Sequence, residues 1–185
     1  MAEVVGKKRK RPSAELTVAA KRKKKTRPCI ITIYTDGSCL GNNRKDAATR
    51  SAGYGIFYGD DDERNVSKRL RGLQTNNRAE MQAIIEACER HADERDTVIE
   101  IITDSIYCKN VVTKWMAGWK RRGWRKADGK EPLNLDMVKR LHGLMNGGMC
   151  KKPVFTWVKG HAATHGNEEA DRLANEGALL PLRKD

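Results

Sequence analysis

Two segments of the sequence are apolar on both of their faces, and each is followed directly by an aspartate. CIITIYT covers residues 29–35 and precedes Asp36, and VIEIIT covers residues 98–103 and precedes Asp104. A strand with one face in water would alternate apolar and polar residues, so these runs predict strands in the middle of a covered sheet. The chain must therefore place helices over a sheet whose buried strands end in carboxylates.

The remaining elements follow from periodicity and turn residues. Five strands are expected, at residues 29–35, 52–59, 65–72, 98–103 and 153–158. Helices are expected at residues 76–91, 105–112, 115–119, 135–144 and 167–178, where apolar residues recur at helical spacing or capping residues stand at the ends. The order βββαβααα-βα predicts an α/β fold, a five-stranded mixed sheet with helices on both faces.

The positive charge of the chain is concentrated in two places. The 185 residues carry a formal net charge of +13. Residues 1–28 carry +9 and residues 114–130 carry +6, which leaves −2 on the rest of the chain. Both basic segments predict a polyanionic partner.

Residues 1–28 form a tail, and residues 29–182 form the folded domain. The tail contains the clusters KKRKR and KRKKK with almost nothing to bury, so it is expected to be disordered. Two basic runs about ten residues apart are typical of a nuclear import signal that binds an import receptor. A tether for nucleic acid is the alternative, and the two roles are compatible.

Several protein classes are excluded. The sequence has no apolar run as long as the roughly 18–20 residues of a membrane span, and its first residues lack the apolar run of a secretory signal. The five cysteines include no CxxC pair, which favours reduced thiols in an intracellular protein, with most of them packed as small buried hydrophobes.

Four acidic residues are candidates for chemistry. Asp36 and Asp104 occupy equivalent strand ends, where ligand sites form in open α/β sheets. Glu80 and Asp171 border the apolar stripes of their predicted helices. Taken singly, each could be a turn residue, a helix cap or an ordinary surface acid.

Five motifs, taken together, resemble the type 1 ribonuclease H family. They are YTDGSC (34–39), QTNNRAEMQA (74–83), ITDS (102–105), WMAGWKRRGW (115–124) and VKGHAATHGNEEADRLA (158–174). They occur in the family's order and spacing across the whole predicted domain. The resemblance implies the ribonuclease H-like fold and hydrolysis of the RNA strand of RNA/DNA hybrids, leaving 5′-phosphate and 3′-hydroxyl ends.

The resemblance also implies the catalytic groups. Asp36, Glu80, Asp104 and Asp171 match the family's metal-binding carboxylates, and His161 matches its mobile histidine. The implied cofactor is a pair of Mg²⁺ ions, with Mn²⁺ as a possible substitute, and carboxylate oxygens are the ligands that these ions prefer. A zinc site at His161 and His165 is disfavoured because Gly160 and Gly166 predict a loop there.

Eight further residues match substrate-binding positions of the family. They are Asn42, Thr75, Asn76, Asn77, Tyr107, Trp115, Trp119 and Asn134. Leu73 departs from the pattern, because the family commonly has an arginine there beside the phosphate of the DNA strand, and Arg71 is a possible replacement. Packing of a helix against the domain is the alternative role for Trp115 and Trp119. His91 and His142 are interpreted as helix-surface residues.

Two other functions stay open, a catalytically silent hybrid-binding module and a DNA-processing nuclease of the same fold. The basic segment 114–130, which contains three tryptophans, is expected to contact the substrate, although a merely solvated loop would have a similar composition. The protein is expected to be nuclear and monomeric, with the RNA/DNA hybrid as its partner and no membrane association.

Overall fold

A computed structural model describes residues 29–41, 43, 49–159 and 164–182. Its five strands form one mixed sheet in the order β3-β2-β1-β4-β5. The strands are β1 (Cys29–Leu40), β2 (Ser51–Phe57), β3 (Val66–Arg69), β4 (Thr97–Thr103) and β5 (Val154–Trp157). The predicted α/β class, the number of strands and the order of the elements are confirmed. The tail, Asn42 and His161 lie outside the described residues.

The long central strand β1 has a different partner along each edge. It pairs in parallel with β4 from Cys29 to Tyr34, and it pairs antiparallel with β2 from Tyr34 to Leu40. The predicted end of this strand at residue 35 is therefore wrong. The strand continues because β2 still supplies hydrogen-bond partners after β4 has ended. Asp36 consequently lies within β1, just beyond the last residue that pairs with β4.

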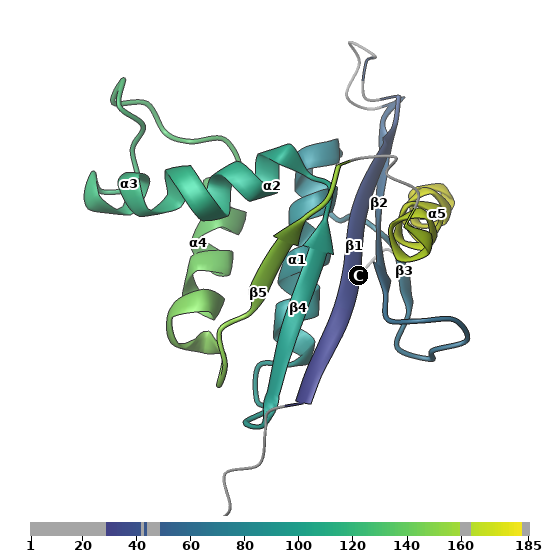
Figure 1. The fold of residues 1–185 in the computed structure, drawn as a ribbon. Helices are drawn as coiled ribbons and strands as arrows, with labels where there is room; N and C mark the ends of the chain where they lie inside the picture. Colours follow the sequence, from purple (N-terminus) through teal and green to yellow (C-terminus); the bar gives the residue numbers. More distant parts are fainter. Residues whose placement is uncertain (1–28, 42, 44–48, 160–163, 183–185) are drawn as a thin grey trace, which may run out of the picture.

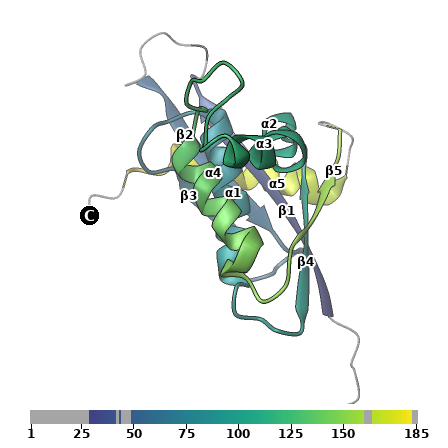
Figure 2. The ribbon, with the colours of Figure 1, turned by 90° about the vertical axis from the view of Figure 1, so that its left-hand side faces the viewer.

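The helices cover both faces of the sheet, as Figures 1 and 2 show. On one face α1 (Asn76–Arg90) packs against β1 and β2 and also against α4 (Leu135–Gly143). On the other face α5 (His165–Leu179) packs against β1, β2 and β3. A short helix α2 (Ile106–Asn110), a π-helical turn (Val111–Trp115) and α3 (Met116–Arg121) follow β4 in succession. A second π-helical turn (Leu144–Gly148) follows α4.

Each face of the sheet has its own apolar core. The larger core lies beneath α1, whose Met81, Ile84 and Ile85 are fully buried among side chains of β1, β2, β4 and α4. The smaller core joins Phe57 of β2 to α5. The prediction that both faces of the two central strands are buried holds only in part. Ile30 near the start of β1 is 66 % exposed, and the residues of β4 that alternate with its buried ones are half-buried, because α5 packs on β1, β2 and β3.

Three details of the sequence prediction are wrong. His165 begins α5 and is not a loop residue. Gly166 lies in the first turn of the same helix, where a Cβ atom would lie 2.4 Å from the ring of Tyr34, so glycine is required there by close packing and does not mark a loop. His91 is buried and not on the helix surface, because Tyr58 and Glu94 bind its two ring nitrogens. Of the five cysteines, two are buried, one is half-buried and two are exposed.

None of the helices within the described ranges is long and apolar enough to cross a bilayer.

Candidate active site

The four predicted carboxylates come from four different elements. Asp36 lies in β1, Asp104 follows β4, Glu80 is in the second turn of α1, and Asp171 is in α5. The helices α1 and α5 lie on opposite faces of the sheet, so the carboxylates approach its edge from both sides (Figure 1). This edge is the one at which β4 ends, as expected for a ligand site of an α/β sheet.

Asp36 is the most buried of the four and shows that they lie close together. Its side chain is 8 % exposed, and one carboxylate oxygen accepts a 2.7 Å hydrogen bond from the backbone N–H of Gly37. Burial, together with the charges of Asp104, Asp171 and Glu80 and against the lowering effect of the Gly37 hydrogen bond, raises its pKa to about 8. The ionised form is therefore disfavoured unless a cation is supplied.

Glu80 is held at both of its oxygens. One accepts a hydrogen bond from the Ser105 hydroxyl, and the other accepts one from Asn76 Nδ2 at 2.8 Å. Burial raises the Glu80 pKa to about 7, with the charge of Asp104 adding to the shift, while the bonds from Ser105 and Asn76 oppose it. These two bonds fix the direction of the Glu80 carboxylate, so Asn76 contacts a predicted metal ligand in addition to its predicted role at the substrate.

Strand β1 and helix α1 approach each other closely at Gly37. A Cβ atom added to Gly37 would lie only 2.1 Å from the backbone nitrogen of Glu80. No side chain larger than hydrogen fits between β1 and α1 at this point. Gly37 thereby sets the spacing between Asp36 and Glu80.

Two residues that the sequence analysis missed hold Asp104. Asn167 Nδ2 donates to a carboxylate oxygen at 3.3 Å, and Trp157 Nε1 donates to the main-chain oxygen at 3.0 Å. Asn167 is 7 % exposed, and its own Oδ1 atom is buried without a partner. No sequence signal distinguishes Trp157, which is the last residue of an edge strand. Asn167 lies within one of the five motifs, but its position alone predicts only an ordinary residue in the first turn of a helix.

The donor set fits a hydrated divalent cation. No ion pair in the described part of the chain involves any of the four carboxylates, although burial makes the negative charge of Asp36 and Glu80 costly. The unpartnered Asn167 oxygen could accept from a metal-bound water. Within the described ranges no three ligand side chains already stand together as a closed metal cage.

Without metal, the protein is expected to lose stability as the pH rises from about 4 to about 8. Asp36 has a folded pKa of about 8 against 3.8 for the ordinary side chain, so in this window the fold retains a proton that the unfolded chain has released. A raised pKa stabilises the fold below the unfolded value, and this contribution is lost as the pH passes the folded value. Chemical denaturation in EDTA should give an unfolding free energy on the order of 2 kcal/mol lower at pH 8.5 than at pH 5.

The variant Asp36→Asn is the control for this pH dependence. It removes the buried titrating group, so its unfolding free energy should fall less steeply over the same range. Mg²⁺ added at pH 8.5 should raise the unfolding free energy of the natural protein by more than that of this variant. A pH slope unchanged by Asp36→Asn would contradict the assignment.

The aromatic residues predicted to contact substrate form one row. The ring centroids of Tyr107 and Trp115 are 6.1 Å apart, and those of Trp115 and Trp119 are 5.6 Å apart. Trp119 is buried in the larger core, whereas Trp115 is 37 % exposed. Packing therefore accounts for Trp119, and Trp115 and Tyr107 retain the surface that a substrate could contact.

Asn134 joins this row from the start of α4. Its Nδ2 donates to the Tyr107 hydroxyl at 3.1 Å, and its Oδ1 accepts from Arg78 Nη1 at 3.4 Å. Arg78, which the sequence analysis did not select, also forms two hydrogen bonds to the carboxylate of Asp136, at 2.9 and 2.6 Å. Thr75 directly precedes α1, Asn77 is exposed at its start, and Leu73 is exposed.

A protein family and several curated proteins match this chain over most of its length. The family model for RNase H matches residues 28–179. Human ribonuclease H1 is 39 % identical over 149 residues, which are 80 % of this chain and 50 % of the human protein. Ribonuclease H of Maricaulis maris is 42 % identical over 147 residues, covering 80 % of this chain and 92 % of that protein. The chain thus spans about half the length of its mammalian relatives and nearly all of a bacterial one.

Solved structures show the same fold. LC9-RNase H1 superposes with a TM-score of 0.61 at 30 % identity, over 84 % of this chain and 74 % of that one. A foamy viral protease-reverse transcriptase in complex with an RNA/DNA hybrid superposes with a TM-score of 0.67 at 23 % identity, over 90 % of this chain and 22 % of that one. The second likeness supports the architecture alone.

Proposed function

Because the chain belongs to the RNase H family, we propose that it is an endonuclease that hydrolyses the RNA strand of RNA/DNA hybrids and leaves 5′-phosphate and 3′-hydroxyl ends. The observation that carries this proposal is the buried Asp36, whose pKa is raised by burial and by three further carboxylates and which has no cation partner among the described residues. Such a cluster suits metal-assisted phosphodiester hydrolysis.

We propose that Asp36, Glu80, Asp104 and Asp171 hold two Mg²⁺ ions, with Mn²⁺ as a substitute. The ions would supply an activated water and stabilise charge on the attacking and leaving oxygens. The chain contributes orientation, since Ser105 and Asn76 direct Glu80 while Asn167 directs Asp104. His161 is proposed to assist proton transfer at the leaving group, because histidine is the side chain type that most readily exchanges a proton near neutral pH.

Substrate recognition is proposed for two sets of residues. The exposed faces of Tyr107 and Trp115 would pack against deoxyribose of the DNA strand, with Trp119 behind them in the core. Thr75 and Asn134 would contact a phosphate of that strand. Asn42, Asn76 and Asn77 would read the RNA strand, whose 2′-hydroxyl groups distinguish a hybrid from DNA.

A cleavage assay with end-labelled duplexes tests this function. The RNA/DNA hybrid should be cut in Mg²⁺ and left intact in EDTA, and RNA/RNA and DNA/DNA duplexes of the same sequence should be left intact in both. Equal cutting of the DNA duplex would favour a DNA-processing nuclease. Binding of the hybrid without cleavage in Mg²⁺ or Mn²⁺ would favour a silent binding module.

Deletion of residues 1–28 is expected to weaken hybrid binding and its dependence on salt. The segment carries a net charge of +9, and each phosphate contact contributes about 0.9 to the slope of log affinity against log salt concentration. Fluorescence anisotropy with a labelled, uncleavable hybrid should show a slope smaller by about 3 or more. The cleavage rate at saturating substrate should stay within twofold of the full chain.

An unchanged slope would mean that the tail is a localisation signal and does not bind the hybrid. We propose both roles for it, a nuclear import signal bound by an import receptor and a tether for nucleic acid. The protein is proposed to act as a monomer, because the active site draws all four carboxylates from one chain.

A further inference from the structure

The main-chain oxygen of Asp104 has an unusual partner. Strand β4 ends at Thr103, and α2 is capped by Ser105, so Asp104 belongs to neither element. The carbonyl of Ser105 accepts a hydrogen bond from the N–H of Lys109 in the first turn of α2. The carbonyl of Asp104 lies one residue earlier, outside this pattern. The oxygen would need water or a side chain, and Trp157 Nε1 donates to it at 3.0 Å.

Trp157 extends the ladder between β4 and β5 by one step. Thr103 pairs with Trp157 in the parallel register, and Val158 N–H donates to Thr103 O at 3.1 Å. The next carbonyl after β4 is that of Asp104, and it accepts a hydrogen bond from the Trp157 indole in place of a backbone N–H. A tryptophan at the last position of β5 thereby holds the residue that follows β4.

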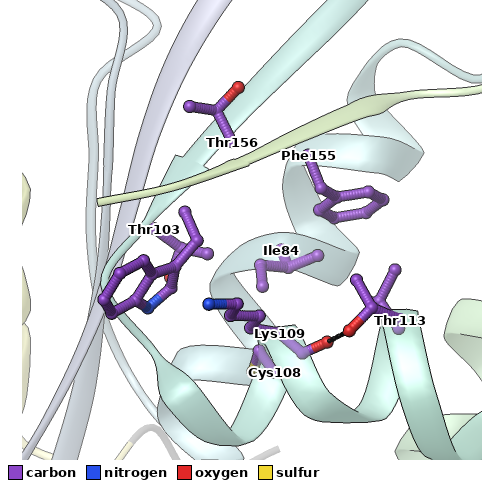
Figure 3. A pocket seen from close by; sticks show the side chains of 9 residues that line it. Ile84, Thr103, Cys108, Lys109, Thr113, Phe155 and Thr156 are labelled. Carbon is purple, nitrogen blue, oxygen red and sulfur yellow. Dashed lines mark hydrogen bonds between the residues drawn. The ribbon is translucent and has the colours of Figure 1, made fainter. Parts of the chain in front are cut away.

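A lysine and a cavity border the indole. Trp157 is 36 % exposed, and Lys109 Nζ lies 4.0 Å from its ring centroid. A cavity of about 230 Å³ adjoins the ring, and Figure 3 shows its lining side chains, among them Lys109, Thr113 and Phe155. Close packing is absent on that side, so the hydrogen bond to Asp104 and the cation of Lys109 set the position of the ring.

We propose that Trp157 is a positioning residue for Asp104, and that its indole N–H, held in place by Lys109, orients the Asp104 carboxylate for metal binding. The proposal rests on the metal-dependent function given above. The only side-chain contact of this carboxylate in the described structure is the 3.3 Å bond from Asn167, which is long for a hydrogen bond to a charged group. The main-chain anchor therefore carries much of the orientation. Loss of an outer partner of a metal ligand typically lowers metal affinity 10–100-fold.

The variant Trp157→Phe separates this role from simple packing. It keeps an aromatic ring for Lys109 and for the cavity wall, and it removes the N–H. Titration of the free protein with Mg²⁺, followed by NMR, should give a dissociation constant about tenfold higher than that of the natural protein. In the cleavage assay the half-activating Mg²⁺ concentration should rise by a similar factor, while the KM for hybrid stays within twofold.

Tyr58→Phe is the matched control. It also removes one hydrogen-bonding group from a partly buried aromatic residue, the hydroxyl 3.2 Å from His91 Nε2, and it lies outside the site. Its Mg²⁺ dissociation constant should stay within twofold of the natural value even if its stability falls.

A second measurement uses the natural protein and requires no folded variant. The Trp157 indole N–H resonance should shift during the Mg²⁺ titration with the same midpoint as the metal-binding curve. An unmoved resonance, or a Trp157→Phe protein that binds Mg²⁺ as tightly as the natural one, would overturn the positioning role. If the natural protein binds Mg²⁺ but does not cut the hybrid, the proposed function fails and the affinity comparison still decides the role of Trp157.

Discussion

Replacing Asp104 by asparagine is expected to lower the cleavage rate by at least about 10³-fold, because several kcal/mol of metal-borne charge stabilisation in the transition state would be lost. The substitution keeps the shape of the side chain, so Asn167 and Trp157 retain their partners in outline. Single-turnover cleavage of the labelled hybrid in saturating Mg²⁺ measures the effect. Binding of the hybrid should be little changed, since the substrate groups lie on other residues.

The same substitution should stabilise the metal-free protein. Asp104 is one of the charges that raise the Asp36 pKa, so its removal relieves repulsion at a buried carboxylate. Thermal unfolding in EDTA at pH 8 should give a higher midpoint than the natural protein. Asp93→Asn, at an exposed turn after α1, is the control and should change neither the rate nor the midpoint. Cleavage by Asp104→Asn within tenfold of the natural rate would remove Asp104 from the metal site.

Gly37→Ala should strongly destabilise the protein. The new Cβ would lie 2.1 Å from the backbone nitrogen of Glu80 and 2.5 Å from the carbonyl carbon of Ala79. Both atoms belong to the backbone of α1, so the helix must move away from β1. Overpacking against backbone is expected to cost about 3 kcal/mol, which corresponds to a melting temperature lower by roughly 6–12 °C.

Displacement of α1 would also separate Glu80 from Asp36. Cleavage by the folded fraction of Gly37→Ala should therefore fall by about 10²-fold, since misplacement of a catalytic group by 1 Å can have that effect. Gly59→Ala is the matched control, because nothing lies within 4 Å of a Cβ at that position. Its rate and melting temperature should equal those of the natural protein. A fully active and stable Gly37→Ala protein would show that β1 and α1 can separate without consequence.

The local sequence predicts the strands that carry Asp36 and Asp104 but not the partners of those strands. The apolar run stops at Thr35, yet β1 continues to Leu40 because β2, which begins at Ser51, still pairs with it. Pairing between distant segments is a non-local property that composition does not contain. Whether Asp36 ends a strand or lies within one could therefore be decided only in the fold.

The contacts that orient the carboxylates also could not be predicted from the sequence. Trp157 lies 53 residues from Asp104, and Asn167 lies 63 residues from it. A similar distance in sequence explains the wrong interpretation of His91, whose partner Tyr58 lies 33 residues earlier. The four carboxylates were proposed because their motifs match a family. Asn76, Ser105 and Asn167 lie in the same motifs, but nothing local shows which carboxylate each one contacts, and Trp157 lies outside the motifs altogether.

The placement of Asp171 on α5, the last helix described, has a consequence for protein synthesis. The strand that carries Asp36 leaves the ribosome first, and α5 must dock on β1, β2 and β3 before the fourth carboxylate arrives. A nascent chain therefore emerges with the proposed metal site incomplete. On the proposed function, cleavage of RNA/DNA hybrids should begin only once α5 has docked on the sheet.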